Sequence, residues 1–174
     1  KLALTAISMV VLNSASHAQA QMNHSSPMAG ADSVKKNSVC QGIGLECANA
    51  ATPFLSQDGM LLLAWTANGV VSVAQSGDQG KTFSSPIKIA EHGKALDSGS
   101  DARPQILADL TGNIFLAYAF FKDSSWNAQI NTSRSIDGGK TFSMPESLVK
   151  DSSSQRFPSA LIRPDGSIFM SWID

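Results

Sequence analysis

Short apolar segments recur along the chain with turn residues between them. Each lies between a glycine and an aromatic residue six positions beyond that glycine, and the three pairs are Gly59 and Trp65, Gly112 and Tyr118, and Gly166 and Trp172. A second apolar segment, led by Pro53, Pro104 or Pro158, precedes each turn. Two apolar runs separated by a glycine-containing turn are typical of a β-hairpin. The second strand of each hairpin is apolar at nearly every position, which predicts a strand covered on both faces.

Further strands are expected after the first two hairpins. Residues 70–74 and 128–132 form a third segment, and residues 87–89 and 147–149 form a short fourth. Four antiparallel strands that recur every 53 to 59 residues are typical of a blade of a β-propeller. The pattern predicts an all-β fold with two complete blades and a third that stops after its second strand. Because propellers need at least four blades, we expect the natural protein to continue beyond Asp174. The chain begins with Lys1 rather than Met, so we expect it to be a fragment at this end as well.

One sequence motif occurs twice, at Ser76–Phe83 and Ser135–Phe142, and these segments are here called the two repeat motifs. Both read S-x-D-x-G-K-T-F and both continue into Ser-x-Pro. We expect the aspartates to accept hydrogen bonds from backbone N–H groups one or two residues on, and the glycines to adopt positive φ. The serines should cap the turn and the phenylalanines should anchor it in a core. The motif predicts a structural role for Ser76, Asp78, Gly80, Phe83, Ser135, Asp137, Gly139 and Phe142.

The first twenty residues have the layout of a secretory signal peptide. A basic residue precedes an apolar run, and Ala18–Ala20 forms an A-x-A cleavage site, so the mature chain is predicted to start at Gln21. An N-terminal membrane anchor is the alternative interpretation. The signal peptide predicts a secreted or periplasmic protein.

Residues 21–47 form a polar leader before the blades, which occupy residues 48–174. Met22, His24 and Met28 lie close together there, and thioether and imidazole groups suit copper(I). A processed tail with unrelated methionines explains the same residues. Cys40 and Cys47 are predicted to form a disulfide in an oxidising compartment, because two thiolates are too few for a closed zinc site.

The composition and net charge of the chain limit the classes of partner that it can be expected to bind. The chain has 174 residues, of which 43% are hydrophobic and 16% charged, and its formal net charge is -1. This balance gives no electrostatic basis for binding nucleic acid, and none for a membrane once the signal peptide is removed. A glycan or protein ligand remains open.

The two repeat motifs and the four-stranded units around them resemble the sialidase (neuraminidase) superfamily and the bacterial neuraminidase (Asp-box) repeat proteins. The resemblance covers roughly residues 48–174. It implies a propeller of six blades when complete, of which about two and a half are present here. In the family the motif lies away from the active site. Three arginines clamp the substrate carboxylate, a tyrosine activated by a glutamate is the nucleophile, and an aspartate is the acid/base.

Only some of these residues have counterparts here. Arg156-Phe157-Pro158 matches the R-x-P pattern of the first family arginine, and Arg103 lies directly before Pro104. By position, Asp97 and Asp101 are candidates for the acid/base. The alternative for Arg103 and Arg156 is that they cap strand ends or pair with Asp101 and other carboxylates. Tyr118 occupies a repeating core position. Trp126 either stacks on a sugar or packs on a neighbouring blade.

Two functions remain open on the sequence alone. One is an exported exo-sialidase or related glycoside hydrolase acting on terminal sugars, with catalytic candidates Arg156, Arg103 and Asp101. The other is a non-catalytic propeller of the cell envelope that binds a glycan, a protein or copper. In either case we expect this chain alone to be inactive, because a propeller site uses residues from around the whole ring.

Overall fold

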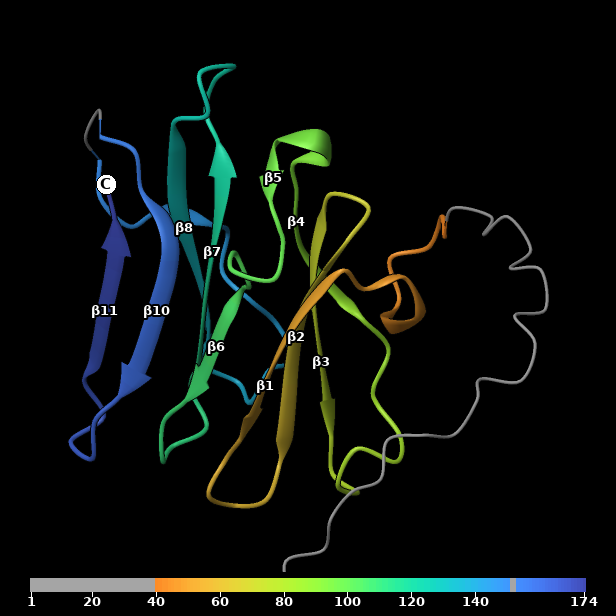
Figure 1. Cartoon of the computed structure of the whole chain (residues 1–174). Helices are drawn as coiled ribbons and strands as arrows, with labels where there is room; N and C mark the ends of the chain where they lie inside the picture. Colours follow the sequence, from red (N-terminus) through yellow and green to blue (C-terminus); the bar gives the residue numbers. More distant parts are fainter. Residues whose placement is uncertain (1–39, 151–152) are drawn as a thin grey trace, which may run out of the picture. The chain divides into compact units, whose positions relative to one another are not determined.

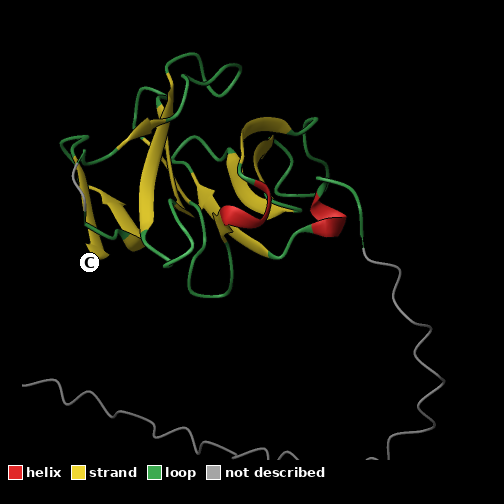
Figure 2. Cartoon of the chain, turned by 90° about the horizontal axis from the view of Figure 1, so that it is seen from above, coloured by secondary structure: helices red, strands yellow, loops and turns green. Residues whose placement is uncertain are grey.

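The computed structural model describes residues 40–150 and 153–174. The described residues belong to one compact unit of the chain. The predicted signal peptide and the residues Met22, His24 and Met28 lie outside the described residues. The described part consists of strands and loops with two short 3-10 helices, η1 (Leu45–Cys47) and η2 (Gly93–Ala95) (Figure 2). It contains no helix of the length and apolar character needed to cross a bilayer.

The first sheet has the strand order of a propeller blade. Its strands are β1 (Ala50–Leu55), β2 (Leu61–Ala67), β3 (Val70–Ser76) and β4 (Ile87–Glu91) (Figure 1). Each pairs antiparallel with the next along the chain, in the order β1-β2-β3-β4. The prediction of four consecutive antiparallel strands is confirmed for this unit, although all four strands run further than the predicted segments, β1 at its start and β2, β3 and β4 at their ends.

The second sheet differs from the first at both of its edges. Its strands are β5 (Leu96–Asp97), β6 (Gln105–Ala108), β7 (Ile114–Phe121), β8 (Ala128–Ser135) and β9 (Glu146–Ser147). Both β5 and β6 pair with β7, so two short pieces occupy the place of a single first strand. The predicted fourth strand at 147–149 is wrong by one position at its start and by two at its end. Glu146 and Ser147 pair with β8, and the Leu148 amide donates a hydrogen bond to the Ile130 carbonyl just beyond them.

The third sheet is the hairpin of β10 (Arg156–Ile162) and β11 (Ile168–Ile173). The repeating aromatic position is buried in the first two units, where Trp65 and Tyr118 are 0% and 1% exposed. At the corresponding position of β11, Trp172 is 36% exposed, and no described strand beyond β11 covers this sheet.

The apolar core lies between successive sheets. One cluster joins Leu62, Val71 and Val73 of the first sheet to Ile106 and Leu116 of the second. Another joins β6, β7 and β8 of the second sheet to apolar residues of β10 and β11. The first strands of the three units are neighbours, since β1 contacts β6 and β6 contacts β10. Face-to-face stacking of four-stranded sheets with adjacent first strands is the arrangement of propeller blades.

Both repeat motifs form the same hydrogen-bonded turn. In the second, Ser135 Oγ accepts a bond of 2.8 Å from the amide of Gly139 and donates one of 2.8 Å to Asp137 Oδ1. The Asp137 carboxylate also accepts from both the amide and the hydroxyl of Thr141. The expectation that the aspartates bond one or two residues on is therefore wrong, because these donors lie three and four residues on. The turn directs the Asp137 carboxylate toward the backbone amides of Lys140 and Thr141, which follow the turn.

The remaining features of the motifs match the predicted geometry. Gly80 and Gly139 have φ values of +84° and +82°, and both phenylalanines are partly buried against apolar clusters. The Thr82 hydroxyl, its amide and the Ser76 hydroxyl lower the pKa of Asp78 to about 2. Equivalent bonds, led by that from the Thr141 hydroxyl, lower the pKa of Asp137 as well. An aspartate held in this way is a poor proton donor near neutral pH.

Figure 1 shows that the sheets have two distinct ends. The turns β1–β2, β6–β7 and β10–β11 lie at the lower end in this view, together with the loop that follows β3. The opposite end carries β5, the loop from β7 to β8 and the start of β10. Asp97 and Arg156 therefore lie at the end away from the repeat motifs.

Candidate functional site

A bidentate ion pair joins the second and third units at this end. Arg156 Nε lies 2.9 Å from Asp97 Oδ2, and Arg156 Nη2 lies 3.2 Å from Asp97 Oδ1. The Asp97 side chain is 7% exposed and that of Arg156 34%. The hydrogen bonds to Asp97 raise the pKa of Arg156, and Asp101 makes a smaller contribution in the same direction. Fork-to-fork pairing fixes the plane of the guanidinium group.

This pairing changes the roles expected of Asp97 and Arg156. The sequence places Asp97 in an open loop as an acid/base candidate, but the structure places it in β5, with both oxygens bonded to Arg156. Both oxygens are therefore occupied by Arg156, and Asp97 presents no free carboxylate to a ligand. Of the two alternatives for Arg156, pairing with a carboxylate is the one that the structure shows. Within the described residues, Arg156 Nη1 makes no hydrogen bond, so its two N–H groups remain available to a ligand.

A β-bulge sets the direction of the Arg156 side chain. Arg156 pairs with Ile173, and the register of β10 and β11 then shifts before Ser159. Phe157, within the bulge, has a φ of +53°, which is strained for an aromatic residue. The Arg156 guanidinium carbon lies 4.4 Å from the centre of the Phe157 ring and 5.0 Å from that of Phe121. Bulges and strained residues of this kind are concentrated at functional sites, where they redirect a side chain.

Asp101 and Arg103 lie on the exposed loop between β5 and β6. Arg103 Nε donates a 2.8 Å hydrogen bond to the carbonyl of Ser100, within its own loop. No described contact brings Arg103 to Arg156, so the structure does not assemble a pair of clamp arginines from these two residues. Asp101 is exposed and contributes to the field at Arg156. Of the two acid/base candidates, Asp101 is the one with a solvent-accessible carboxylate.

An open cleft of about 430 Å³ lies between η2 and the loop from β7 to β8. Its lining residues are Lys94, Ala95, Phe121, Lys122, Asp123, Ser124 and Trp126. Trp126 is 67% exposed and meets Phe121 edge to face, with ring centres 4.9 Å apart. Phe121 belongs to the same hairpin, so this packing is not onto a neighbouring blade. Because Phe121 contacts both Arg156 and Trp126, the cleft adjoins the ion pair.

Sequence reasoning missed a role for His92. Its ring stacks on Phe120 with centres 4.1 Å apart, and its Nε2 lies 3.2 Å from the Tyr118 hydroxyl. Burial lowers the pKa of His92 and raises that of Tyr118. His92 directly precedes η2 and so holds one wall of the cleft against β7. Tyr118 is 1% exposed, which agrees with a structural role.

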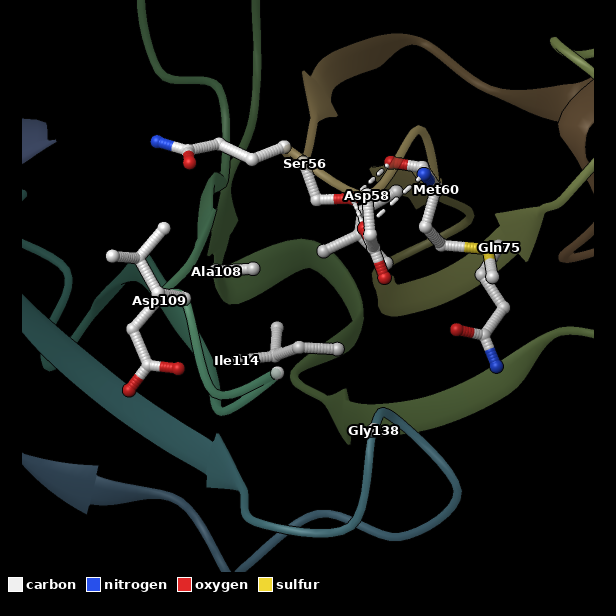
Figure 3. Close-up of a pocket in the computed structure, with 12 residues that line it drawn as sticks. Ser56, Asp58, Met60, Gln75, Ala108, Asp109, Ile114 and Gly138 are labelled. Atoms are coloured by element: carbon white, nitrogen blue, oxygen red, sulfur yellow. Dashed lines mark hydrogen bonds between the residues drawn. The ribbon is translucent and has the colours of Figure 1, made fainter.

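A second hollow, of about 470 Å³, lies at the other end of the sheets (Figure 3). Asp58 and Asp109 line it on the first turns of the two units. Asp58 accepts hydrogen bonds from the Ser56 hydroxyl and the Met60 amide. Asp109 accepts from Thr111 and Asn113. Both carboxylates are used to shape their turns, so the hollow does not contain a free acid/base pair.

The N-terminal part of the described chain is tied to the first blade. A disulfide links Cys40 and Cys47, whose Cα atoms are 5.4 Å apart. The indole N–H of Trp65 donates a 2.8 Å bond to the carbonyl of Ile43, and Asn68 bonds to the carbonyl of Gly42. No cluster of three or more His, Cys, Asp or Glu side chains suited to a metal occurs in the described ranges. The candidate copper ligands Met22, His24 and Met28 lie outside the described ranges.

Comparison with known proteins places the fold. No protein-family model matches the sequence, and no curated protein matches it. The chain is similar in structure to the Hadza microbial sialidase Hz136, with a TM-score of 0.53 and 20% identity over 76% of this chain. An endo-arabinase from Bacteroides thetaiotaomicron (17% identity over 70% of this chain) and a Penicillium chrysogenum alpha-L-arabinanase (15% over 74%) match with TM-scores of 0.45.

These matches cover only part of each known structure. The chain spans 34% of the sialidase and 49% and 46% of the two arabinan-degrading enzymes. The prediction of sialidase-type β-propeller blades is confirmed at the level of the fold, by the sialidase match and by the antiparallel four-stranded sheet.

Proposed function

We propose that the protein is an exported carbohydrate-binding propeller of the sialidase type, and that Arg156 binds an acidic group of a terminal sugar. The geometry of Arg156 carries this proposal. Asp97 occupies one edge of the guanidinium group and fixes its orientation, which leaves Nη1 able to donate to a ligand carboxylate. The bulge and the strained Phe157 support a binding role, because the fold sustains them at the site of an arginine.

Binding is better supported than catalysis by these residues. The Asp97 carboxylate is paired with Arg156, and Tyr118 is buried against His92, so neither side chain is open to a substrate. Hydrolysis of a terminal sialoside by the whole protein is the enzymatic form of the proposal. In that form Asp101 is the acid/base, because its carboxylate is exposed and its charge is close enough to Arg156 to raise the pKa of the guanidinium group. The remaining catalytic groups would come from other blades. The predicted signal peptide at residues 1–20 supports export to the periplasm or the exterior.

A binding experiment with a conservative substitution tests the proposal. Isothermal titration measures the affinity of the complete protein, as wild type and as Arg156→Lys, for the methyl α-glycoside of N-acetylneuraminic acid. The substitution keeps the positive charge but loses the planar fork of N–H donors. We expect the affinity to fall by about tenfold or more, which corresponds to the loss of one charge-assisted hydrogen bond.

The matched control is Arg134→Lys. Arg134 is an exposed arginine near the ring of Phe115, and it makes no ion pair in the described structure. This control should leave the affinity unchanged. Equal affinities for the wild type and Arg156→Lys would refute the proposal. A fluorogenic sialoside assay on the complete protein, with Asp101→Asn as the variant, separates hydrolysis from binding alone.

A further inference from the structure

We propose that the cleft beside Trp126 binds a second sugar ring, next to the one at Arg156, so that the protein recognises an oligosaccharide rather than a single terminal sugar. The inference rests on the proposed function for the position of the first sugar. The evidence for the second sugar is the shape of the cleft and the chemistry of its lining residues.

The loop from β7 to β8 is built to expose an aromatic ring. Trp126 has a φ of +65° and is 67% exposed, a combination that is unfavourable both for the backbone and for an indole in water. Asp123 holds the loop in this form: its Oδ1 accepts from the amides of Ser125 and Asn127, and its Oδ2 accepts from the Asn127 side chain. The loop therefore presents Trp126 in a preorganised position.

Phe121 limits how the indole can turn. Its ring meets Trp126 at an interplanar angle of 89°, so an edge-to-face contact supports one side of the aromatic pair. An exposed, immobilised indole offers a flat apolar surface of the size of a pyranose ring, whose C–H groups are apolar on one face. The volume of the cleft, about 430 Å³, lies within the range of about 300–1,000 Å³ that small-molecule sites occupy.

The polar groups of the cleft are mainly donors. Lys122 Nζ donates a 2.7 Å hydrogen bond to the carbonyl of Ser153, which anchors this side of the cleft. Lys94 lies on the opposite wall, on η2, and among the described residues its ammonium group has no ion-pair partner. Asp123 is already satisfied within its loop. A ligand rich in hydrogen-bond acceptors, such as the hydroxyl and ring oxygens of a sugar, fits a cleft with one aromatic platform and an available ammonium group.

Phe121 joins the two sites. Arg156 lies 5.0 Å from the centre of its ring, and the ring of Trp126 lies 4.9 Å from the same centre. The guanidinium carbon of Arg156 and the centre of the Trp126 ring are therefore at most about 10 Å apart. Two sugars joined by a glycosidic bond can bridge a span of this size.

The test compares a monosaccharide with an oligosaccharide. The probes are the methyl α-glycoside of N-acetylneuraminic acid and 3′-sialyllactose, titrated calorimetrically into the complete protein as wild type, Trp126→Ala and Trp126→Phe. We expect Trp126→Ala to lower the affinity for sialyllactose by about tenfold and to leave that for the monosaccharide unchanged. Trp126→Phe should retain most of the affinity, because it keeps an aromatic platform. Thermal melting checks that the variants fold: Trp126→Ala keeps the positive φ and loses the contact with Phe121, so a small decrease in melting temperature is expected while the transition stays cooperative.

The outcomes separate the two proposals. If Trp126→Ala binds sialyllactose as tightly as the wild type does, or loses affinity for both probes equally, the second sugar site is refuted while the role of Arg156 stands. If the wild type binds sialyllactose no more tightly than the monosaccharide, the second site is also refuted. If the wild type binds neither probe, both proposals fail for sialosides.

Discussion

Removal of the Ser135 hydroxyl tests whether the second repeat motif stabilises its blade through buried hydrogen bonds. Ser135 is 1% exposed, and its Oγ makes three contacts. It accepts from the amide of Gly139 at 2.8 Å and from that of Asp137 at 3.4 Å, and it donates to Asp137 Oδ1. Gly139 is buried, so in Ser135→Ala its amide has no partner and little access to water.

The size of the effect follows from that buried amide. A buried donor left without an acceptor costs about 1–3 kcal/mol, whereas a hydrogen bond whose partner regains water contributes about 0.5–1.5 kcal/mol. Ser76 makes the same bonds in the first motif, but the amide that it accepts from, that of Gly80, is only partly buried. We therefore expect Ser135→Ala to destabilise the protein by about 1–3 kcal/mol and Ser76→Ala by less. For a domain of this size the larger loss lowers the melting temperature by roughly 2–12 °C.

Thermal and urea unfolding, followed by circular dichroism, measure the difference. Lys140→Ala is the matched control in the same turn, because Lys140 is exposed and only its backbone amide contributes to the motif. The control should melt within about a degree of the wild type, as surface substitutions usually do. A Ser135→Ala variant that melts with the control, or a Ser76→Ala variant that is the less stable of the two, would contradict the reasoning.

Two further predictions concern pH and covalent structure. Burial lowers the pKa of His92 below its unfolded value of about 6.5, so the unfolded chain binds more protons, and stability should decrease as the pH falls from about 7 towards 5. His92→Phe should show a smaller decrease in urea midpoint over that range, and an equal decrease would exclude His92 as the cause. The exported protein should have an intact mass two hydrogens below that of the dithiol form, from the bond between Cys40 and Cys47. Closure of so short a loop stabilises by about 2–3 kcal/mol, so Cys47→Ser should melt lower in non-reducing buffer but not in reducing buffer.

The elements that the sequence predicts well are those specified by neighbouring residues. Gly59, Gly112 and Gly166 have φ values of +84°, +83° and +81°, so each hairpin turn is specified by a local glycine. The repeat motifs are equally local, since all the side-chain hydrogen bonds within them span four residues or fewer. Side-chain periodicity and turn chemistry within a short window suffice for such elements.

The candidate site was less predictable because its contacts join distant parts of the chain. Arg156 and Asp97 are 59 residues apart, and Asp97 lies in a two-residue strand that only its pairing with β7 defines. His92 reaches Tyr118 across 26 residues. The R-x-P pattern singled out Arg156, but neither the bulge after it nor its carboxylate partner leaves a local signal. The positive φ of Trp126 likewise depends on the hydrogen bonds of Asp123. The exposure of its side chain depends on the position of the hairpin at the end of the sheets.

The placement of the apolar core between sheets has a consequence for folding. The repeat visible in the sequence is a four-stranded sheet, but Leu62 and Val71 of one sheet and Leu116 of the next belong to the same cluster. A single sheet cut from its neighbour would therefore expose an apolar face, so the unit that was duplicated is not a unit that folds alone. Adjacent blades should unfold cooperatively, and amide hydrogens of β2 and β7 should exchange with solvent at similar rates even though they belong to different repeats.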